Sequence, residues 1–396
     1  MGFRETGLVD ERLRFVLECL SGDDGMSALC ERYGVSRKTG YKWLKRFQAE
    51  GAKGLADRSH APLQHGRSTP DDLVAAILAE KGAWPGFGPK KIMARLRRRA
   101  PDMAWPAVST AGEILKRHGL VGRRRARWRG AGTGPFAPIL EPNAVWSADY
   151  KGWFRLKDAS RCEQLAVMDG HCRTLLGLKA CASTGEAEAW PLFLALFEEN
   201  GLPERIRSDN GPPFASAGIS GLSPLAVRFI KLGIKLERIT PGKPQQNGAQ
   251  ERLNLTLAPL ASAPARTRAE QQACFDRFRA DYNHERPHEA IGMDMPAERY
   301  VKSPRPMPKV PPEPDYPPEA AVRRVRSTGE IKWKGGTVYV SESLIGEPVA
   351  IEETEAGEWA LRFHHHPIGV IDDRTGKLRR TGRPPRGTAG AKPTRL

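Results

Sequence analysis

The sequence predicts a chain of several domains, in which two all-α units come first, a mixed α/β domain follows, and a small β-barrel comes last. Three observations predict this organisation. The chain has 396 residues, more than one hydrophobic core usually organises. The hydrophobic pattern changes from helical periodicity to strand-like runs near residue 144. Stretches rich in Pro and Gly separate the parts.

The composition is that of a folded, strongly basic protein. With 39% hydrophobic residues the chain is not wholly disordered, and its net charge of +17 indicates an acidic partner. No apolar run approaches the roughly 18 residues of a membrane span. Acidic residues within the first 20 positions argue against a signal peptide, so we expect a protein that stays inside the cell. Its six cysteines are scattered, which favours reduced thiols over disulfides or a zinc site.

The domain boundaries follow the shifts in pattern. We expect two helical units at 1–58 and 68–122, a basic linker at 123–143, the α/β domain at 144–300, a proline-rich linker at 301–318, the barrel at 319–375 and a basic tail at 376–396. The excess positive charge is concentrated in residues 90–129, which hold thirteen basic and two acidic residues. Such a stretch is typical of contact with a polyanion.

The first helical unit has the sequence pattern of a helix-turn-helix. Helices are expected at 9–20, 26–33 and 36–49, with Gly34 in the tight turn and Ser36 as the N-cap of the third helix. Tyr41, Leu44 and Phe47 are expected to turn inward. The outward residues, which we expect to contact DNA, are Arg37, Lys38, Thr39, Lys42 and Arg46. The alternative is a three-helix packing module with a solvated basic face.

The second helical unit repeats this plan. Helices are expected at 71–81, 89–99 and 106–118, and Ser109 and Thr110 begin a second candidate recognition helix. Two units in series could hold a longer DNA site than one. The run Arg123, Arg124, Arg125 then starts a basic tether, which could lie along phosphates or remain solvated.

The middle of the chain predicts a mixed sheet with helices on its faces. The expected strands are 145–156, 163–169, 174–181, 204–207 and 234–239, and the expected helices are 186–200, 222–232 and one that begins at 246. Short strands separated by glycines then predict the small barrel. These strands are 321–326, 330–333, 337–340, 348–353, 359–364 and 368–372.

Three carboxylates of the middle domain occupy unusual positions. Asp149 lies within a strand, Asp209 follows a short strand, and Glu251 lies on the helix that starts at 246. Oxygen ligands without His or Cys nearby favour two Mg²⁺ or Mn²⁺ ions, which suit an in-line phosphoryl displacement. The plainer interpretation is a turn for Asp209 and a solvated helix position for Glu251. Asp149 has no comparable explanation.

Four motifs in this order resemble those of the integrase-core transposases of bacterial insertion sequences, which are related to retroviral integrases. They are Trp146-Ser147-Ala148-Asp149, the segment Ser208–Phe214 with Asp209, the segment Pro244–Arg252 with Glu251, and Tyr282–His288 followed by Pro296–Tyr300. The resemblance covers residues from about 145 to 300, and the paired helical units and C-terminal barrel agree with one subgroup's layout.

The resemblance implies a ribonuclease H-like core in which Asp149, Asp209 and Glu251 form the catalytic, metal-binding triad. It implies a DNA transposase whose helix-turn-helix units bind terminal inverted repeats and whose core cleaves and joins DNA strands. The expected partners are double-stranded DNA and further copies of the chain, and no membrane is involved. The expected location is the bacterial cytoplasm, in association with the nucleoid. Loop residues near the scissile phosphate would be Lys243, Gln245, Gln246 and Asn247, unless they only shape the loop.

The chain also departs from the family. Leu253-Asn254-Leu255 replaces a basic or histidine pair after the glutamate, and Pro259 and Pro264 are expected to end that helix early. Asp169 is a rival metal ligand that we interpret as a turn residue. The segment His284–His288 matches H-E-x-x-H formally, but Pro287 breaks the helix that a zinc site needs.

Two other functions remain open at this point. One is a noncatalytic DNA-binding regulator that keeps the core as an assembly platform, and the other is a metal-dependent nuclease that cuts without joining. An Asp149→Asn variant separates the first from an enzyme, and the DNA products formed with Mg²⁺ separate the second.

Overall fold

The computed structural model describes residues 7–58, 68–122, 136, 138–240 and 244–380. It divides into two compact units, Met1–Asp71 and Asp72–Leu396. Within the described ranges, no helix is long and apolar enough to cross a membrane.

The first unit contains three α-helices and a short 3-10 turn. They are α1 (Leu8–Ser21), α2 (Met26–Arg32), α3 (Arg37–Glu50) and η1 (Gly51–Leu55). Gly34, with φ 63°, makes the turn between α2 and α3 as predicted. Ser36 caps α3, because its hydroxyl accepts a hydrogen bond from the Thr39 N–H at 3.2 Å.

The inward face of α3 differs from the prediction. Tyr41 is 57% exposed, so the expectation that it turns inward is wrong. Gly40 and Trp43 are buried instead, with Leu44 beside them. A Cβ on Gly40 would lie 2.6 Å from the Cys30 Sγ, so α3 approaches α2 closely at this residue. This close approach sets the rotation of α3 and leaves Tyr41 outside.

Residues 51–55 belong to the first unit, whose expected range is 1–58. They form η1, whose Leu55 is fully buried in the core of the first unit. Arg12 donates a hydrogen bond from Nη1 to the Leu55 carbonyl at 2.8 Å. An apolar side chain in a polar, Gly-containing stretch therefore extends the unit past α3.

The second unit begins with another helical triplet, close to the predicted ranges. It comprises α4 (Asp71–Ala83), α5 (Pro89–Arg99) and α6 (Val108–Arg117). Ile77, Ile92 and Leu115 are among the buried side chains that join the three helices. Helix α5 begins with Pro89, a residue suited to the first turn of a helix.

The central sheet has five strands in the order β3-β2-β1-β4-β5. The strands are β1 (Val145–Arg155), β2 (Arg161–Asp169), β3 (Leu175–Cys181), β4 (Arg205–Ser208) and β5 (Lys235–Arg238). β2 pairs antiparallel with both of its neighbours, whereas β1, β4 and β5 run parallel. This mixed sheet agrees with the ribonuclease H-like core that the sequence implies.

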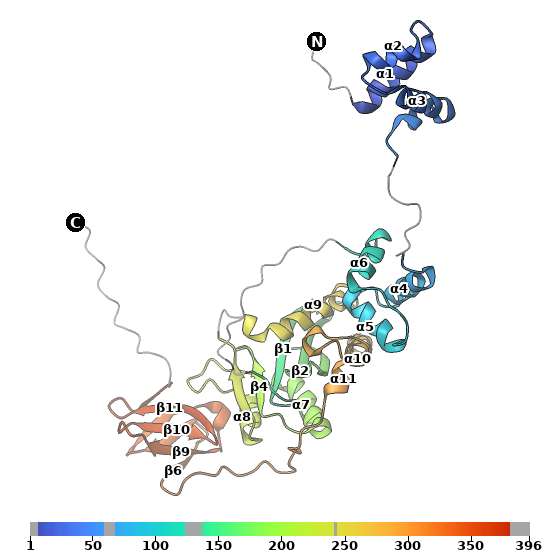
Figure 1. Cartoon of the computed structure of the whole chain (residues 1–396). Helices are drawn as coiled ribbons and strands as arrows, with labels where there is room; N and C mark the ends of the chain where they lie inside the picture. Colours follow the sequence, from blue (N-terminus) through green and yellow to red (C-terminus); the bar gives the residue numbers. More distant parts are fainter. Residues whose placement is uncertain (1–6, 59–67, 123–135, 137, 241–243, 381–396) are drawn as a thin grey trace, which may run out of the picture. The chain divides into compact units, whose positions relative to one another are not determined.

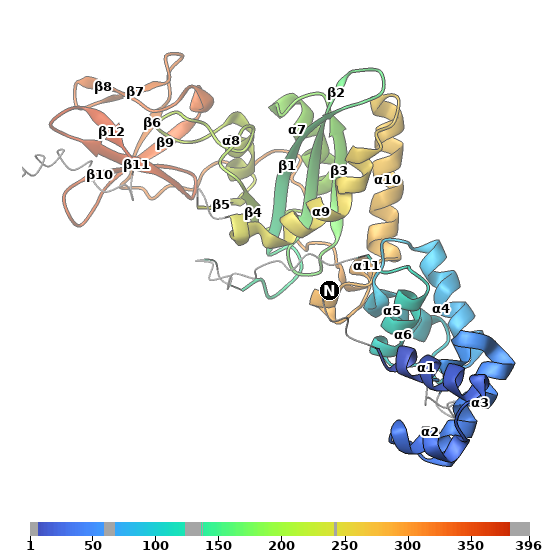
Figure 2. The same cartoon turned by 90° about the horizontal axis from the view of Figure 1, so that it is seen from above.

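Helices cover both faces of this sheet (Figures 1 and 2). They are α7 (Glu186–Asn200), α8 (Pro224–Lys231), α9 (Gly248–Ser262), α10 (Arg268–His284) and α11 (Pro296–Arg299), with short turns η2 (Pro244–Asn247) and η3 (Glu289–Ile291). Leu165 and Val167 of β2 face the core beneath α7 and α8. Their neighbours Ala166 and Met168 face the core beneath α9 and α10. The alternation along β2 assigns one helical layer to each face.

Pro259 does not end its helix, contrary to the prediction. α9 continues through Pro259 to Ser262, and the Ala263 N–H bonds to the Pro259 carbonyl at 3.1 Å. Leu253 and Leu257 of this helix are buried against the sheet. We infer that this packing offsets the one helical hydrogen bond that proline removes. Helix α10 ends at His284, so His284 and His288 do not share a helix.

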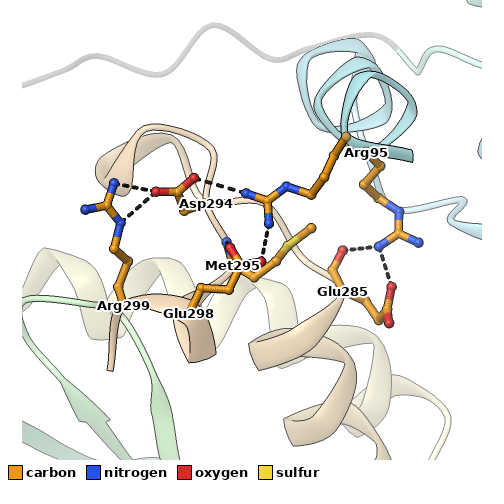
Figure 3. Close-up of polar contacts among 7 residues, drawn as sticks. Arg95, Glu285, Asp294, Met295, Glu298 and Arg299 are labelled. Carbon is orange, nitrogen blue, oxygen red and sulfur yellow. Dashed lines mark hydrogen bonds and ion pairs between the residues drawn. The ribbon is translucent and has the colours of Figure 1, made fainter. Parts of the chain in front are cut away.

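Ion pairs tie α5 to the segment that follows α10 (Figure 3). Arg95 is 8% exposed and donates to the Glu285 Oε2 at 2.6 Å. Arg98 pairs with Asp294 at 3.1 Å and also with Glu298. The second helical triplet is therefore docked on the α/β domain by charged groups.

The C-terminal strands form open sheets, so the predicted barrel is not confirmed. The strands are β6 (Ala321–Arg324), β7 (Glu330–Trp333), β8 (Gly336–Tyr339), β9 (Pro348–Glu353), β10 (Trp359–Phe363), β11 (His366–Asp372) and β12 (Lys377–Arg379), with η4 (Glu342–Leu344). One sheet has the order β12-β11-β10-β9-β6, and β7 and β8 form a hairpin. β12 lies beyond residue 375, the expected end of this domain.

The packing of helix α8 on the C-terminal sheet explains why this sheet need not close into a barrel. Its Val227 and Ile230 belong to the same apolar cluster as Val349 and Phe363 of the C-terminal sheet. Lys231 of α8 pairs with Glu347 at 2.7 Å. The apolar face that a barrel would bury against its own strands is partly covered by the α/β domain.

Candidate active site

Asp149 lies on β1, and Asp209 lies at the matching position just beyond the end of the adjacent strand β4. β1 and β4 run parallel, with Ser147 paired to Arg207. Asp149 is two residues beyond Ser147, and Asp209 is two residues beyond Arg207. Residues two apart on a strand face the same side of the sheet, so the two aspartates lie at one level. The Asp209 Oδ1 accepts a hydrogen bond from the Gly211 N–H at 3.1 Å, which orders the turn after β4.

Helix α9 brings Glu251 to the same region. Two buried polar side chains fix this helix over β1. Gln250 accepts a hydrogen bond from the Ser147 hydroxyl at 3.1 Å, and Asn254 donates to the Asp149 Oδ2 at 2.9 Å. These residues are four apart and so share one face of α9. Glu251 directly follows Gln250 and is exposed beside this contact.

The carboxylates of Asp209 and Glu251 affect the pKa of Asp149. The pKa of Asp149 is raised to about 6, mainly by burial, and the negative charges of Asp209 and Glu251 contribute to this rise. The amide of Asn254 and the cation of Lys151 act in the opposite direction. A half-buried carboxylate with two acidic neighbours is a group that a cation would stabilise.

The donor atoms fit a hard divalent cation, although the described residues contain no preassembled group of three or more His, Cys, Asp or Glu side chains arranged to hold one. Asp149 and Asp209 supply carboxylate oxygens. The Oδ1 of Asn254, beside Asp149, is buried and has no hydrogen-bond partner in the part of the chain that the structure describes. All of these are oxygen ligands, which suit Mg²⁺ or Mn²⁺. The exposed side chain of Glu251 would have to turn toward the aspartates to complete the set.

Asp169 has a structural role. It is fully buried, and its Oδ2 accepts a hydrogen bond from the Asn143 N–H at 2.8 Å. Its Oδ1 accepts from the N–H groups of His171 and Cys172 at 2.9 and 2.8 Å. Its Oδ1 therefore orders the β2–β3 turn, as the turn interpretation of its sequence expected, and its Oδ2 holds the residue Asn143 that precedes β1.

The predicted DNA-binding residues of α3 and α6 are mostly at the surface. Arg37, Lys38 and Lys42 are exposed on α3, and Ser109 and Thr110 are exposed on α6. Thr39 and Arg46 are half-buried on α3. Lys42 and Arg46 each lie over the Trp43 ring, at 4.7 and 5.0 Å from its centre. Contact of these groups with DNA stays a prediction.

The loop before Glu251 is only partly described. Arg123, Arg124, Arg125 and Lys243 lie outside the described residues, and the side chain of Gln245 is not described either. Gln246 and Asn247 are buried. The Gln246 Oε1 accepts a hydrogen bond from the Thr240 N–H at 2.7 Å, which favours a role in shaping the loop.

The sequence interpretation missed Gln250 and Asn254. Both lie on the buried face of α9 with Leu253 and Leu257. Polar residues four apart on an otherwise apolar helix face are a signal of specific hydrogen bonds, because burying them without partners is costly. The sequence comparison with the family marks Asn254 only as part of a departure from a basic or histidine pair.

We predict that Asp149→Asn stabilises the metal-free protein at neutral pH. Below pH 3.8 the carboxyl is protonated in both the folded and unfolded states, so it has no effect. As the pH rises from 3.8 through about 6, the unfolded state ionises first, and stability falls. The full cost above pH 6 is about 3 kcal/mol by the free energy of a pKa shift. Asn avoids it.

Thermal unfolding at pH 3.5 and 7.5 without divalent cations tests this prediction. The matched control is Asp281→Asn, on the exposed side of α10, which should change neither melting temperature. An Asp149→Asn protein no more stable than the parent at pH 7.5 contradicts the proposed cost of ionising Asp149.

Three family models match separate parts of the chain. Residues 11–62 match the helix-turn-helix domain, residues 232–296 match the integrase core domain, and residues 320–379 match the C-terminal domain of IS481 family transposases. A protein of insertion element IS407 from Burkholderia multivorans, described as an uncharacterized 31.7 kDa protein, is 26% identical over 193 residues. The match covers 48% of this chain and 67% of that protein.

Solved structures with some likeness include viral integrases. A chain of the simian T-cell lymphotropic virus intasome in complex with PP2A regulatory subunit B56 gamma has 16% identity and a TM-score of 0.36, with 75% of this chain and 99% of that chain covered. The HTLV-2 integrase catalytic core domain in complex with magnesium has 17% identity and a TM-score of 0.30, with 41% and 99% covered.

Proposed function

We propose that this chain, which belongs with the integrase-core transposases of insertion elements, is a metal-dependent transposase that binds the terminal inverted repeats of its element and cuts and joins DNA strands there. The observation that carries the proposal is the placement of Asp149 on β1 and of Asp209 directly after the parallel neighbour β4, with Glu251 on the helix that hydrogen-bonds to Asp149.

The residues of the site have separate tasks in this proposal. Asp149, Asp209 and Glu251 would hold two Mg²⁺ or Mn²⁺ ions, and Asn254 holds the Asp149 carboxylate in position through its amide. When bound, such ions lower the pKa of the attacking hydroxyl and stabilise the leaving oxygen. Gln250 fixes α9 on the sheet, so the backbone of Glu251 is held in place while its side chain turns toward the aspartates.

One active site would carry out two chemically similar steps, strand cleavage and strand joining. In cleavage, a water oxygen attacks the phosphorus at the element end, and the bond to the 3′ oxygen breaks, which leaves a 3′-hydroxyl. In joining, that hydroxyl attacks a phosphodiester of target DNA, and the 3′ oxygen of the target strand leaves. Cleavage hydrolyses one phosphodiester to a 5′-phosphate and a 3′-hydroxyl, and joining exchanges one phosphodiester P–O bond for another, so neither step needs a nucleotide cofactor.

The other domains supply recognition in this proposal. The exposed basic residues of α3 and the exposed start of α6 suit contacts with duplex DNA. Both ends of an element must be processed together, so we expect at least two copies of the chain to assemble on DNA.

Incubation of the protein with Mg²⁺ and a labelled duplex that carries one end of its element tests the function. We expect strand cleavage at the end and joined products with a second duplex, and neither with EDTA. Cleavage without joining in Mg²⁺ would establish a nuclease instead. Binding without either reaction would establish a regulator.

A further inference from the structure

A group of basic side chains beside α9 is not explained by the fold or by the proposed chemistry. Its members come from four segments. They are Lys91 of α5, Arg173 of the β2–β3 turn, Arg252 of α9, and Arg286 and His288 after α10. We call these five residues the cationic cluster. Arg252 directly follows Glu251, so the cluster adjoins the candidate active site.

Two aromatic rings link three members of the cluster. The Lys91 Nζ and the Arg286 Cζ lie 5.7 and 5.4 Å from the centre of the same Phe87 ring. Arg286 also lies 5.8 Å from the centre of the Tyr282 ring, and the His288 ring is 4.8 Å from that ring centre. Cations gathered on aromatic faces are partly stabilised there, but these rings carry no net charge.

The cluster lacks carboxylate partners. None of its five members forms an ion pair within the described part of the chain. The nearby Glu289 is paired with Lys90 at 3.1 Å, and both oxygens of Asp169 accept backbone hydrogen bonds. On the same helix, Lys90, Arg95 and Arg98 all have acidic partners. Lys91 therefore stands apart from its neighbours on α5.

Donor atoms of the cluster are buried without partners. The Arg286 Nε and the His288 Nε2 have no hydrogen-bond partner among the described residues, although the Arg286 Nη2 donates to the Thr256 hydroxyl at 3.3 Å. Burial, followed by the charge of Arg286, lowers the pKa of Lys91 to about 7. Burial, followed by Lys91, Arg286, Arg173 and Arg252, lowers the pKa of His288 to about 3. The positive charges of Arg173, Arg252, Arg286 and protonated Lys91 repel one another in the free protein, and an anion would reduce that repulsion. His288, with its lowered pKa, is neutral at pH 7.

We propose that the cationic cluster binds a phosphate group of the DNA backbone beside the active site, and that α5 must be docked on the α/β domain to complete it. A phosphodiester supplies the negative charge and the acceptor oxygens that Arg286 and Lys91 lack. The cluster joins the second helical triplet to α9, so a phosphate bound there would position the DNA strand relative to Glu251. The assignment of this phosphate to DNA rests on the proposed function.

The test uses the full-length protein with Lys91→Gln and Arg286→Gln, and with Lys90→Gln as the matched control, since Lys90 is adjacent but paired with Glu289. Binding to a duplex of the element end is measured in EDTA over a range of salt concentrations. We expect each cluster variant to bind roughly tenfold more weakly at low salt, with a salt slope smaller by about one. Lys90→Gln should match the parent.

A second measurement separates a binding role from a packing role. Without DNA, Lys91→Gln should melt at a higher temperature than the parent, because it removes an uncompensated charge. Inorganic phosphate should raise the melting temperature of the parent more than that of Lys91→Gln. A residue needed only for packing would lower stability and leave the salt slope unchanged, which would overturn the proposal.

The remaining outcomes are also decisive. Phosphate stabilisation with an unchanged DNA salt slope in both cluster variants would mean a site for free phosphate and would overturn the DNA assignment. A parent protein that neither cleaves nor joins, combined with the reduced slopes, would refute the transposase proposal and leave the phosphate site intact. Normal joining with unchanged slopes would refute the phosphate site alone.

Discussion

Asp149→Asn is expected to lower strand cleavage and strand joining at least 10²- to 10³-fold, the range typical of losing one preorganised electrostatic contact, while DNA affinity stays within about twofold. Asn keeps the size and one oxygen of Asp149 but removes the negative charge at the centre of the site. The charges of Asp209 and Glu251 act on this carboxylate, so its loss weakens the field of the whole site. The same variant should be more stable than the parent, so misfolding would not explain the loss.

The measurement follows labelled element ends in Mg²⁺ for cleavage and joining, with DNA binding assayed in EDTA. Asp209→Asn and Glu251→Gln should behave alike, and Asp281→Asn should retain full activity. If Asp149→Asn kept a large part of the joining activity, the carboxylates would not form the catalytic site.

Arg95→Met is expected to reduce the free energy of unfolding of the second unit by about 3 kcal/mol, the usual cost of breaking a buried ion pair. Arg95 and Glu80 are both nearly fully buried and form an ion pair, and Arg95 also reaches Glu285 at 2.6 Å. Its guanidinium lies 4.6 Å from the centre of the Trp84 ring, where the Met side chain can still pack. Glu80 would retain only Arg99, at 3.1 Å.

Denaturant unfolding and hydrogen exchange of α4 and α5 report this loss. Arg97→Met is the control, because Arg97 is exposed on the same helix and makes one hydrogen bond to the Pro106 carbonyl at 3.1 Å. The double variant Glu80→Met with Arg95→Met should recover part of the stability, since it leaves no buried charge unpaired. An Arg95→Met protein as stable as Arg97→Met would show that this pair does not hold α5.

Local patterns were sufficient to predict most of the fold. Ser36 at a helix start and Gly34 in the preceding turn are local signals, and both have the predicted roles. The strand runs of the α/β domain were predictable because β3 is nearly continuously apolar and β2 contains the apolar run from Leu165 to Met168. Asp149 stood out from sequence alone because a carboxylate within such a strand requires a special environment.

The remaining features depend on contacts between distant segments. Gly40 sets the rotation of α3 through its approach to Cys30, and no periodicity of α3 alone reveals this. The C-terminal sheet stays open where α8 packs on it, which requires knowledge of both domains. The bond from Asn254 to Asp149 joins residues 105 positions apart. Sequence spacing could not show it.

Anomalous X-ray diffraction from crystals of the protein soaked in Mn²⁺ tests the central claim most directly. We predict a manganese peak within bonding distance of the carboxylates of Asp149 and Asp209, with Glu251 turned toward it. Manganese bound only at other residues, with these carboxylates left unligated, would contradict the assignment of the active site.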